Sequence, residues 1–272
     1  MYGSALFVVV PTGLFVLLLA VVHRRWAPRG GWLRDVPAAG GIFSTAGTGL
    51  AVLLAFIIVA TFDSYQTGRD ATGREAVATQ QLDAMAGYFD DPLQTELKGE
   101  SVCYARAVIH DGWPAMQNGG EGTVVQVWVD QMDATMQEQV VTDPLQIEAA
   151  AHWFEVNKDR QDGRRSRIAE SQPFVPGFLW GALILLTLVV LGYQVLFVDR
   201  SARLLGQAVG MGAMAATLCA GLTVTWMIDR PFNDRGAMIS PSRMEAVLVL
   251  MERTAPSPLP CDEQGNPVRR PA

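Results

Sequence analysis

Four long runs of apolar residues stand out along the chain. They contain no Lys, Arg or Glu, and each can cross the roughly 30 Å hydrocarbon core of a bilayer, which takes about 20 helical residues. A backbone in hydrocarbon must satisfy its own hydrogen bonds, so each run is expected to be a helix. The pattern predicts an all-α, multi-pass membrane protein with four transmembrane helices at residues 5–22, 42–62, 174–198 and 204–228.

Between the second and third runs, apolar residues recur at spacings of three and four, which is typical of amphipathic helices. Helix 2 is expected to continue along such a stripe, with a kink at Gly68 or Gly73. Asp91-Pro92 and Asp143-Pro144 each suggest an N-cap followed by proline at the first helical position. The polar residues 157–167 are expected to form a solvated helix that leads into span 3. The interval therefore predicts a helical extramembrane block formed by extensions of helices 2 and 3.

The charged residues are concentrated in this block. Only 18% of the 272 residues are charged, against about a quarter in ordinary soluble domains. Residues 63–173 nevertheless hold nine Lys/Arg and 19 Asp/Glu. This composition excludes a disordered chain and a basic nucleic-acid-binding protein. The apolar runs and the acidic block divide the chain into four segments. These are 1–62 with the first two spans, 63–173 as the acidic block, 174–228 with the last two spans, and 229–272 after the membrane.

The segment after the fourth span begins with a loop and then a short apolar stripe formed by Met244, Val247, Leu248 and Met251. We expect this stripe to form an amphipathic helix that lies on the membrane or on the acidic block. Residues 254–272 are rich in proline and polar side chains, so they are expected to be a mobile tail.

The arginines next to the spans predict the orientation in the membrane. Six lie in the two short links, at 24, 25, 29, 34, 200 and 203. Their density favours a cytoplasmic position for the links, and the acidic block then lies on the extracytoplasmic side of the plasma membrane. Cys103 and Cys261 share one side in any four-span topology. If that side is oxidising, the two can form a disulfide.

The order of several short motifs resembles a known family over residues 43–251. The motifs are Phe62-Asp63-Ser64-Tyr65, Arg74-Glu75-Ala76, Tyr104-Ala105-Arg106-Ala107-Val108, Trp113-Pro114, Asp229-Arg230-Pro231-Phe232 and Ser240-Pro241. They resemble the bestrophin-like domain-of-unknown-function family of bacterial and plant membrane proteins. The resemblance implies four membrane helices with helical extensions and, more distantly, kinship with bestrophins, which are pentameric anion channels. The chain lacks the acidic calcium clasp of animal bestrophins, and bestrophins keep their large loop in the cytosol.

The resemblance implies a homo-oligomeric channel, with a pentamer as one option, and helix 2 offers candidates for its pore. Ser44 and Thr48 would form a polar vestibule. A hydrophobic constriction that gates by dewetting would follow, formed by one face with Leu50, Leu54, Ile57 and Thr61. The alternative is that this face packs on lipid or on helix 4.

Helix 4 carries small residues that allow close helix packing in lipid. Gly206 and Gly210 form a GxxxG pair, and Gly212 and Ala216 belong to a second stripe. These surfaces serve either packing within a subunit or a contact between subunits.

A structural latch is expected where helices 2 and 4 end. Asp63 ends helix 2 and Asp229-Arg230 ends helix 4, which predicts an ion pair between Asp63 and Arg230. Pro231 stops helix 4, and Phe232 is expected to fill an apolar gap. The alternative is that these charges act in a pore.

Enzymatic signatures are absent from the sequence, and no metal or cofactor is predicted. Glu148 and His152 lie one helical turn apart, but a solvated pair is favoured over half a metal site. The leading hypothesis is a homo-oligomeric channel that conducts small inorganic ions, with anions implied by the resemblance. The alternative is a non-conducting scaffold or sensor whose acidic block binds a partner protein or a cation. The negative charge of the block argues against a simple anion funnel.

Overall fold

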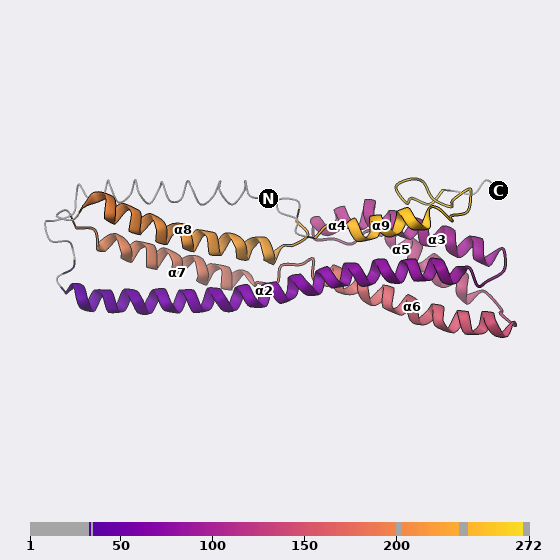
Figure 1. Ribbon diagram of the computed structural model, residues 1–272, viewed down its shortest axis with the longest axis horizontal. Coiled ribbons are helices and arrows are strands. Elements are labelled where there is room, and N and C mark those ends of the chain that lie inside the picture. The colour runs from indigo at the N-terminus through magenta and orange to yellow at the C-terminus, as the bar shows by residue number, and fades with distance from the viewer. Residues whose placement is uncertain (1–32, 34, 200–202, 234–238, 269–272) are drawn as a thin grey trace. The chain divides into compact units, whose positions relative to one another are not determined.

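The computed structural model describes residues 33, 35–199, 203–233 and 239–268. Within these residues all regular elements are helices, apart from one isolated bridge between Cys261 and Pro267. The helices are drawn and labelled in Figure 1. The all-helical prediction is therefore confirmed for the part of the chain that the structure describes.

The chain divides into two compact units. Unit 1 contains residues 1–63 and 173–229, and unit 2 contains residues 64–172 and 230–272. Helix α2 (Val36–Ala86) contributes its first part to unit 1 and the remainder to unit 2.

Unit 1 supplies the apolar helices. Together with α2, the helices α7 (Gly177–Leu196) and α8 (Leu204–Asp229) are long and apolar enough to cross a membrane. The first predicted span, residues 5–22, lies outside the described residues. Only 17% of the most apolar window of α2 and 22% of those of α7 and α8 are buried inside the protein. Helices this apolar and this exposed are typical of a lipid environment.

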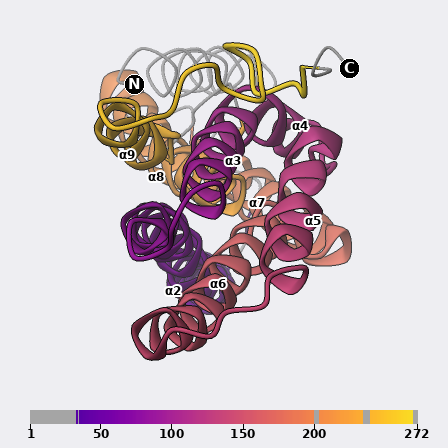
Figure 2. The same ribbon diagram turned by 90° about the vertical axis from the view of Figure 1, so that its right-hand side faces the viewer.

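Unit 2 is a helical bundle, which Figure 2 shows end-on. It combines residues 64–86 of α2 with α3 (Leu93–Ala107), η1 (Val108–Gly112), α4 (Trp113–Gln117), α5 (Thr123–Gln137), α6 (Pro144–Ala169) and α9 (Ser242–Met251). The core is continuous through these helices, and its members include Leu82, Tyr104, Trp128, Trp153 and Met251.

The two Asp-Pro pairs behave differently at the helix starts. Asp143 is the N-cap of α6, and its carboxylate accepts hydrogen bonds from the backbone N–H groups of Leu145 and Gln146, as predicted. The prediction for Asp91 was wrong, because Pro92 occupies the N-cap position of α3. The Asp91 carboxylate instead accepts a hydrogen bond from the hydroxyl of Thr95 at 2.6 Å.

Two glycines inside α2 make room for other segments of unit 2. A Cβ at Gly68 would lie 3.4 Å from the ring of Phe232, and one at Gly73 would lie 2.7 Å from Nη1 of Arg243. Helix α2 nevertheless remains one helix through both positions. The glycines therefore allow close approach to α2, where the sequence suggested a kink.

The predicted extension of span 3 is interrupted. Helix α6 ends at Ala169 and α7 begins at Gly177, and residues 170–176 between them are not helical. Pro173 and Pro176 lie in this connection, and each lacks the backbone N–H that a continuous helix needs.

The predicted mobile tail was wrong for residues 254–268, which we call the C-terminal strap. The strap packs on the helices of unit 2, where the Nε1 of Trp128 on α5 donates a hydrogen bond to the carbonyl of Gly265 at 2.7 Å. Gly265 has φ of +83°, and a Cβ there would lie 2.4 Å from the backbone nitrogen of Ala107, so only glycine fits. Proline-rich composition here reflects an ordered irregular segment.

Candidate functional site

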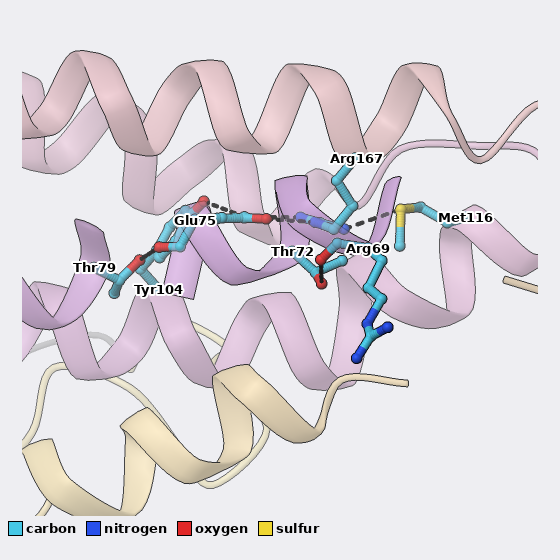
Figure 3. A network of polar contacts seen from close by, with 7 residues as sticks. All are labelled: Arg69, Thr72, Glu75, Thr79, Tyr104, Met116 and Arg167. Carbon is cyan, nitrogen blue, oxygen red and sulfur yellow. Dashed lines mark hydrogen bonds and ion pairs between the residues drawn. The ribbon is translucent and has the colours of Figure 1, made fainter. Parts of the chain in front are cut away.

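The centre of unit 2 is a buried ion pair between α2 and α6 (Figure 3). Nε of Arg167 lies 2.5 Å from Oε2 of Glu75, and Nη2 lies 2.9 Å from Oε1. Both residues are 1% exposed. The Tyr104 hydroxyl from α3 donates a third hydrogen bond to Oε1 at 2.7 Å. One carboxylate therefore joins three helices.

A glycine on α6 permits this arrangement. A Cβ at Gly163 would lie 2.8 Å from the backbone nitrogen of Glu75, so only glycine lets the two helices approach so closely. The remaining side of the Arg167 guanidinium contacts Met116, whose sulfur accepts a hydrogen bond at 3.0 Å, and the Trp113 ring, whose centroid is 5.5 Å away. These contacts exclude water from the guanidinium and restrict it to one position.

A second arginine of α6 is buried beside the pair. Arg160 is fully buried, and its guanidinium lies over the Tyr104 ring, 4.6 Å from the centroid. Nε and Nη2 of Arg160 donate hydrogen bonds to Oδ1 of Asn157, at 3.0 and 2.7 Å. Asn157 in turn donates to Asp133 on α5 at 2.7 Å. The polar network thus extends from α2 to α5.

The protonation states of this network are fixed by its surroundings. Burial raises the pKa of Tyr104, and the charge of Glu75 raises it further. Burial acts to lower the pKa of Arg167, but the charge and hydrogen bonds of Glu75 outweigh it, so the net shift is upward. The phenol stays protonated and the arginine stays charged at physiological pH. The network is suited to hold helices together and not to transfer protons.

The family motifs noted in the sequence meet at this network. Glu75, Tyr104 and Trp113 come from three separate motifs, and the ring of Phe232 packs edge-on against Trp113 at 5.6 Å between centroids. Arg160 and Arg167 were not among the predicted site residues, because the polar residues 157–167 predict a solvated helix. The only available signal was the small residue Gly163 between two arginines on one helix.

The predicted latch residues are divided between the units. In unit 1 the buried carboxylate of Asp229 accepts hydrogen bonds from the backbone N–H of Val175 at 2.7 Å and from Nε1 of Trp180 at 3.3 Å. It therefore joins the end of α8 to the start of α7. In unit 2 Phe232 is 2% exposed, and the carbonyl of Pro231 accepts a hydrogen bond from the N–H of Ile239. The Asp63–Arg230 ion pair would join the two units, and it stays a prediction.

The structure corrects the predicted constriction. Leu50, Leu54, Ile57 and Thr61 are at most 9% exposed, and the three aliphatic residues belong to a core shared with α7 and α8. A Cβ at Gly221 of α8 would lie 2.7 Å from Cδ2 of Leu54, so α8 is shaped to receive this side chain. This face is the packing face of α2, which was the alternative in the sequence analysis, and it does not face an open path.

The opposite face of α2 is open in the described chain. Val52, Phe56 and Val59 are 50%, 71% and 69% exposed. Ser44 and Thr48, the predicted vestibule residues, are also exposed and precede them. Asp63 follows them and is exposed as well. The exposed face thus has polar residues at both ends and large apolar residues between them.

The small residues of α8 do not all pack within the described chain. A Cβ at Gly206, Gly210 or Gly212 would meet no described atom within 4 Å, and Ala216 is half-buried. Gly206 and Gly210 line a groove of about 320 Å³ together with Phe43 of α2 and Gln194 of α7. The choice between packing inside a subunit and contact between subunits stays open.

The two cysteines of unit 2 form a disulfide in the structure. Cys103 of α3 and Cys261 of the strap have Cα atoms 5.8 Å apart, and both are buried. Arg106, one helical turn after Cys103, reinforces the attachment by pairing with Glu252 at 2.6 Å and donating to the Asp262 carbonyl at 3.0 Å. Together with the Trp128 bond, three contacts therefore hold the strap to α3 and α5, and the Arg106–Glu252 pair adds a fourth just before it.

No His, Cys, Asp and Glu cluster suited to a metal ion is found among the described residues. His152 lies 3.3 Å from Glu155 on the surface of α6, and Glu148 and His152 line an open groove of about 440 Å³ beside α2.

A family model described as a Bestrophin-like domain matches residues 6–244. No curated protein matches the chain.

Proposed function

The chain belongs to the Bestrophin-like family, and we propose that it forms a homo-oligomeric channel for small inorganic ions in the plasma membrane. The proposal assigns the ion path to the exposed face of α2. Ser44 and Thr48 begin this path, and Phe56 and Val59 form its hydrophobic constriction.

The composition of the exposed face of α2 carries this proposal. On α7 the large exposed residues are Phe178, Ile184, Leu185, Leu188 and Val189, a uniformly apolar surface that suits lipid tails. The exposed face of α2 instead begins with hydroxyl groups and ends with a carboxylate. A surface with polar ends is expected where water reaches both ends of a narrow apolar segment.

The same face is the reason for proposing an oligomer. A single helix cannot enclose a path for ions, so several copies of α2 must surround it, and a pentamer is the arrangement implied by the bestrophin kinship. The open small residues Gly206 and Gly210 offer a second surface for close helix contact.

The disulfide supports an extracytoplasmic position for unit 2. Disulfides persist in oxidising compartments and are rare in the cytosol. The arginine-rich links then lie in the cytoplasm, in agreement with the positive-inside rule. This orientation is opposite to the one implied by the bestrophin resemblance.

Ion flux from proteoliposomes tests the function. We expect purified full-length protein to let the cation and the anion of a salt gradient leave the proteoliposomes at different rates. Phe56→Ala should raise the ion flux by widening the constriction. Ala55 is the neighbouring exposed position, and Ala55→Ser is the control with little change in volume. Absence of flux over a range of pH and voltage would contradict the proposal and would favour a scaffold.

A further inference from the structure

A groove of about 320 Å³ lies between the apolar helices of unit 1, at the end where the arginine-rich links join them. Its lining includes Gly40 and Phe43 near the start of α2, Gln194 near the end of α7, and Gly206 and Gly210 near the start of α8. Gln194 is two residues from the last residue of α7, or about 3 Å along the helix axis. The groove therefore lies at the depth where a span meets the lipid headgroups.

The walls of this groove suit a hydrocarbon chain. Phe197 and Met211 add to its apolar lining, and the ring of Phe43 packs edge-on against that of Phe197, with 5.5 Å between the centroids. A Cβ at Gly206 or Gly210 would meet no described atom within 4 Å, so α8 leaves open space beside these rings. Concave apolar surfaces with few polar groups are typical of sites for apolar ligands.

One buried polar group of the lining has no hydrogen-bond donor within the described chain. Gln194 is 9% exposed, and its Oε1 accepts no hydrogen bond from a described residue. The Gln207 amide in the same groove differs, because it exchanges two hydrogen bonds with the backbone of Asp199, at 2.9 and 3.0 Å. A buried acceptor without a donor costs free energy, and the last torsion of a glutamine side chain turns easily. Gln194 thus points to an occupant of the groove that carries an O–H or N–H group.

The links at this end of unit 1 are positively charged. Residues 23–35 and 199–203 contain six arginines and two aspartates. Arg203 is exposed directly before α8, and its carbonyl accepts a hydrogen bond from the backbone N–H of Gln207 in the groove lining. Arginines next to a span attract anionic headgroups, and a guanidinium pairs well with phosphate. The charge therefore favours an occupant that carries a phosphate.

From these features we infer that the groove binds an anionic phospholipid whose headgroup carries free hydroxyl groups, as phosphatidylglycerol does. One acyl chain lies against Phe43, Gly206 and Gly210, a headgroup hydroxyl donates to Oε1 of Gln194, and the phosphate pairs with Arg203. The two glycines then receive a lipid in place of a second helix, and the oligomer is left to the exposed face of α2. This lipid site does not depend on ion conduction.

Native mass spectrometry of the delipidated full-length protein in detergent tests the lipid site. The probes are phosphatidylglycerol, phosphatidylethanol, which has the same charge but no headgroup hydroxyl, and phosphatidylcholine, all with the same acyl chains. We expect phosphatidylglycerol to bind about fivefold more tightly than phosphatidylethanol, the effect of one hydrogen bond, and phosphatidylcholine to bind most weakly. Gln194→Leu should abolish the difference between the two anionic lipids. Arg203→Gln should weaken the binding of both about fivefold and leave that of phosphatidylcholine unchanged.

Filling the groove is the second test. Gly210→Leu should weaken the binding of phosphatidylglycerol about tenfold, because the new side chain takes the place of the acyl chain. The matched control is Gly212→Leu, at an equally open glycine of α8 outside the groove lining, and it should leave binding unchanged.

Three results would overturn the lipid site. The first is equal affinity of the unmodified protein for the two anionic lipids, and the second is undiminished lipid binding by Gly210→Leu. The third is dissociation of the oligomer by Gly210→Leu with lipid binding unchanged, which would assign the groove to a second copy of the chain. Lipid binding is measured without ion flux, so the site and the channel proposal are tested separately.

Discussion

The two units use polar groups in opposite places. In the described part of unit 1 the buried side chains are apolar, hydroxyl or amide groups, with Asp229 as the exception, and large apolar residues such as Phe56 remain exposed. Unit 2 buries Glu75, Arg160 and Arg167 and carries most of its other charges outside. In lipid, apolar burial gives little driving force between helices, so unit 1 depends on fit, as at Leu54 and Gly221. Next to water, unit 2 can use hydrophobic burial and add a network that fixes the register of its helices.

The largest effect is expected from breaking the buried ion pair of unit 2. Arg167→Met leaves the Glu75 carboxylate buried with only Tyr104 as a hydrogen-bond donor among its described side-chain contacts. The free energy of unfolding should fall by about 3–5 kcal/mol. Urea unfolding of the full chain in detergent, followed by tryptophan fluorescence, measures the change.

The exposed pair between Arg165 and Asp162 is the control, and Arg165→Met should cost at most about 0.5 kcal/mol. The double variant Glu75→Leu/Arg167→Met should recover part of the loss, because neither member of this pair is then left buried and charged without the other. A loss no larger for Arg167→Met than for Arg165→Met would contradict the role given to the network.

The disulfide is expected to give the next largest effect. Cys103 and Cys261 are 158 positions apart, and removing a bridge over so long a loop should cost about 2–5 kcal/mol. Cys103→Ser should also free the C-terminal strap for limited proteolysis. Cys219→Ser, which removes the free cysteine, is the control. Equal protease resistance of the strap with and without Cys103 would show that Trp128 and Arg106 suffice to hold it.

A smaller, pH-dependent effect is expected at Asp83, which lies on α2 beyond the predicted span. Burial raises its pKa from 3.8 to about 6, although Lys98 partly opposes the shift. The folded state thus holds this proton more tightly than the unfolded state does, so stability is lost as the pH rises from about 4 to 6. Asp83→Asn should stabilise the protein by about 1–2 kcal/mol at pH 7 and by almost nothing at pH 4.

Melting temperatures of the two proteins at several pH values measure this difference. Asp90→Asn, at an exposed position in the loop after α2, is the matched control. A difference between Asp83→Asn and the parent that stays constant from pH 4 to pH 7 would rule out the titration of Asp83 as its cause.

The smallest change in stability is expected on the exposed face of unit 1. Phe56 is 71% exposed and Leu54 is 9% exposed on the same helix. Leu54→Ala should therefore destabilise unit 1 measurably, whereas Phe56→Ala should change its stability by less than about 0.5 kcal/mol and alter ion flux instead. Unfolding in detergent and flux in liposomes, measured on the same preparations, separate the two effects. Equal destabilisation by both variants would mean that Phe56 packs on a neighbour and does not line a path.

The sequence predicted the elements of the fold better than their faces. Long uncharged runs are an unambiguous signal for apolar helices, and Asp143-Pro144 marked the start of α6 correctly. Residues 50–60 are apolar on every side of the helix, so no periodicity distinguishes the packed Leu54 from the exposed Phe56.

The missed features of unit 2 have a related cause. Arginine is mostly exposed in proteins, so a polar helix gives no indication that Arg160 and Arg167 point inward. Order in the strap depends on Cys103 and Trp128, which are more than a hundred residues away in the chain. Only the fold brings these partners together, so local composition suggested a mobile tail.

Cysteine modification on α2 tests the proposed ion path most directly. In a Cys219→Ser background, Phe56→Cys and Leu54→Cys place a cysteine at two positions of α2 that are two residues apart. The first lies on the exposed face of the helix and the second on its packing face. A charged, membrane-impermeant thiol reagent applied to the reconstituted channel should change the current through Phe56→Cys and leave Leu54→Cys and the α7 control Leu185→Cys unaffected. Block of Leu54→Cys with no effect on Phe56→Cys would contradict the assignment of the exposed face of α2 to the ion path.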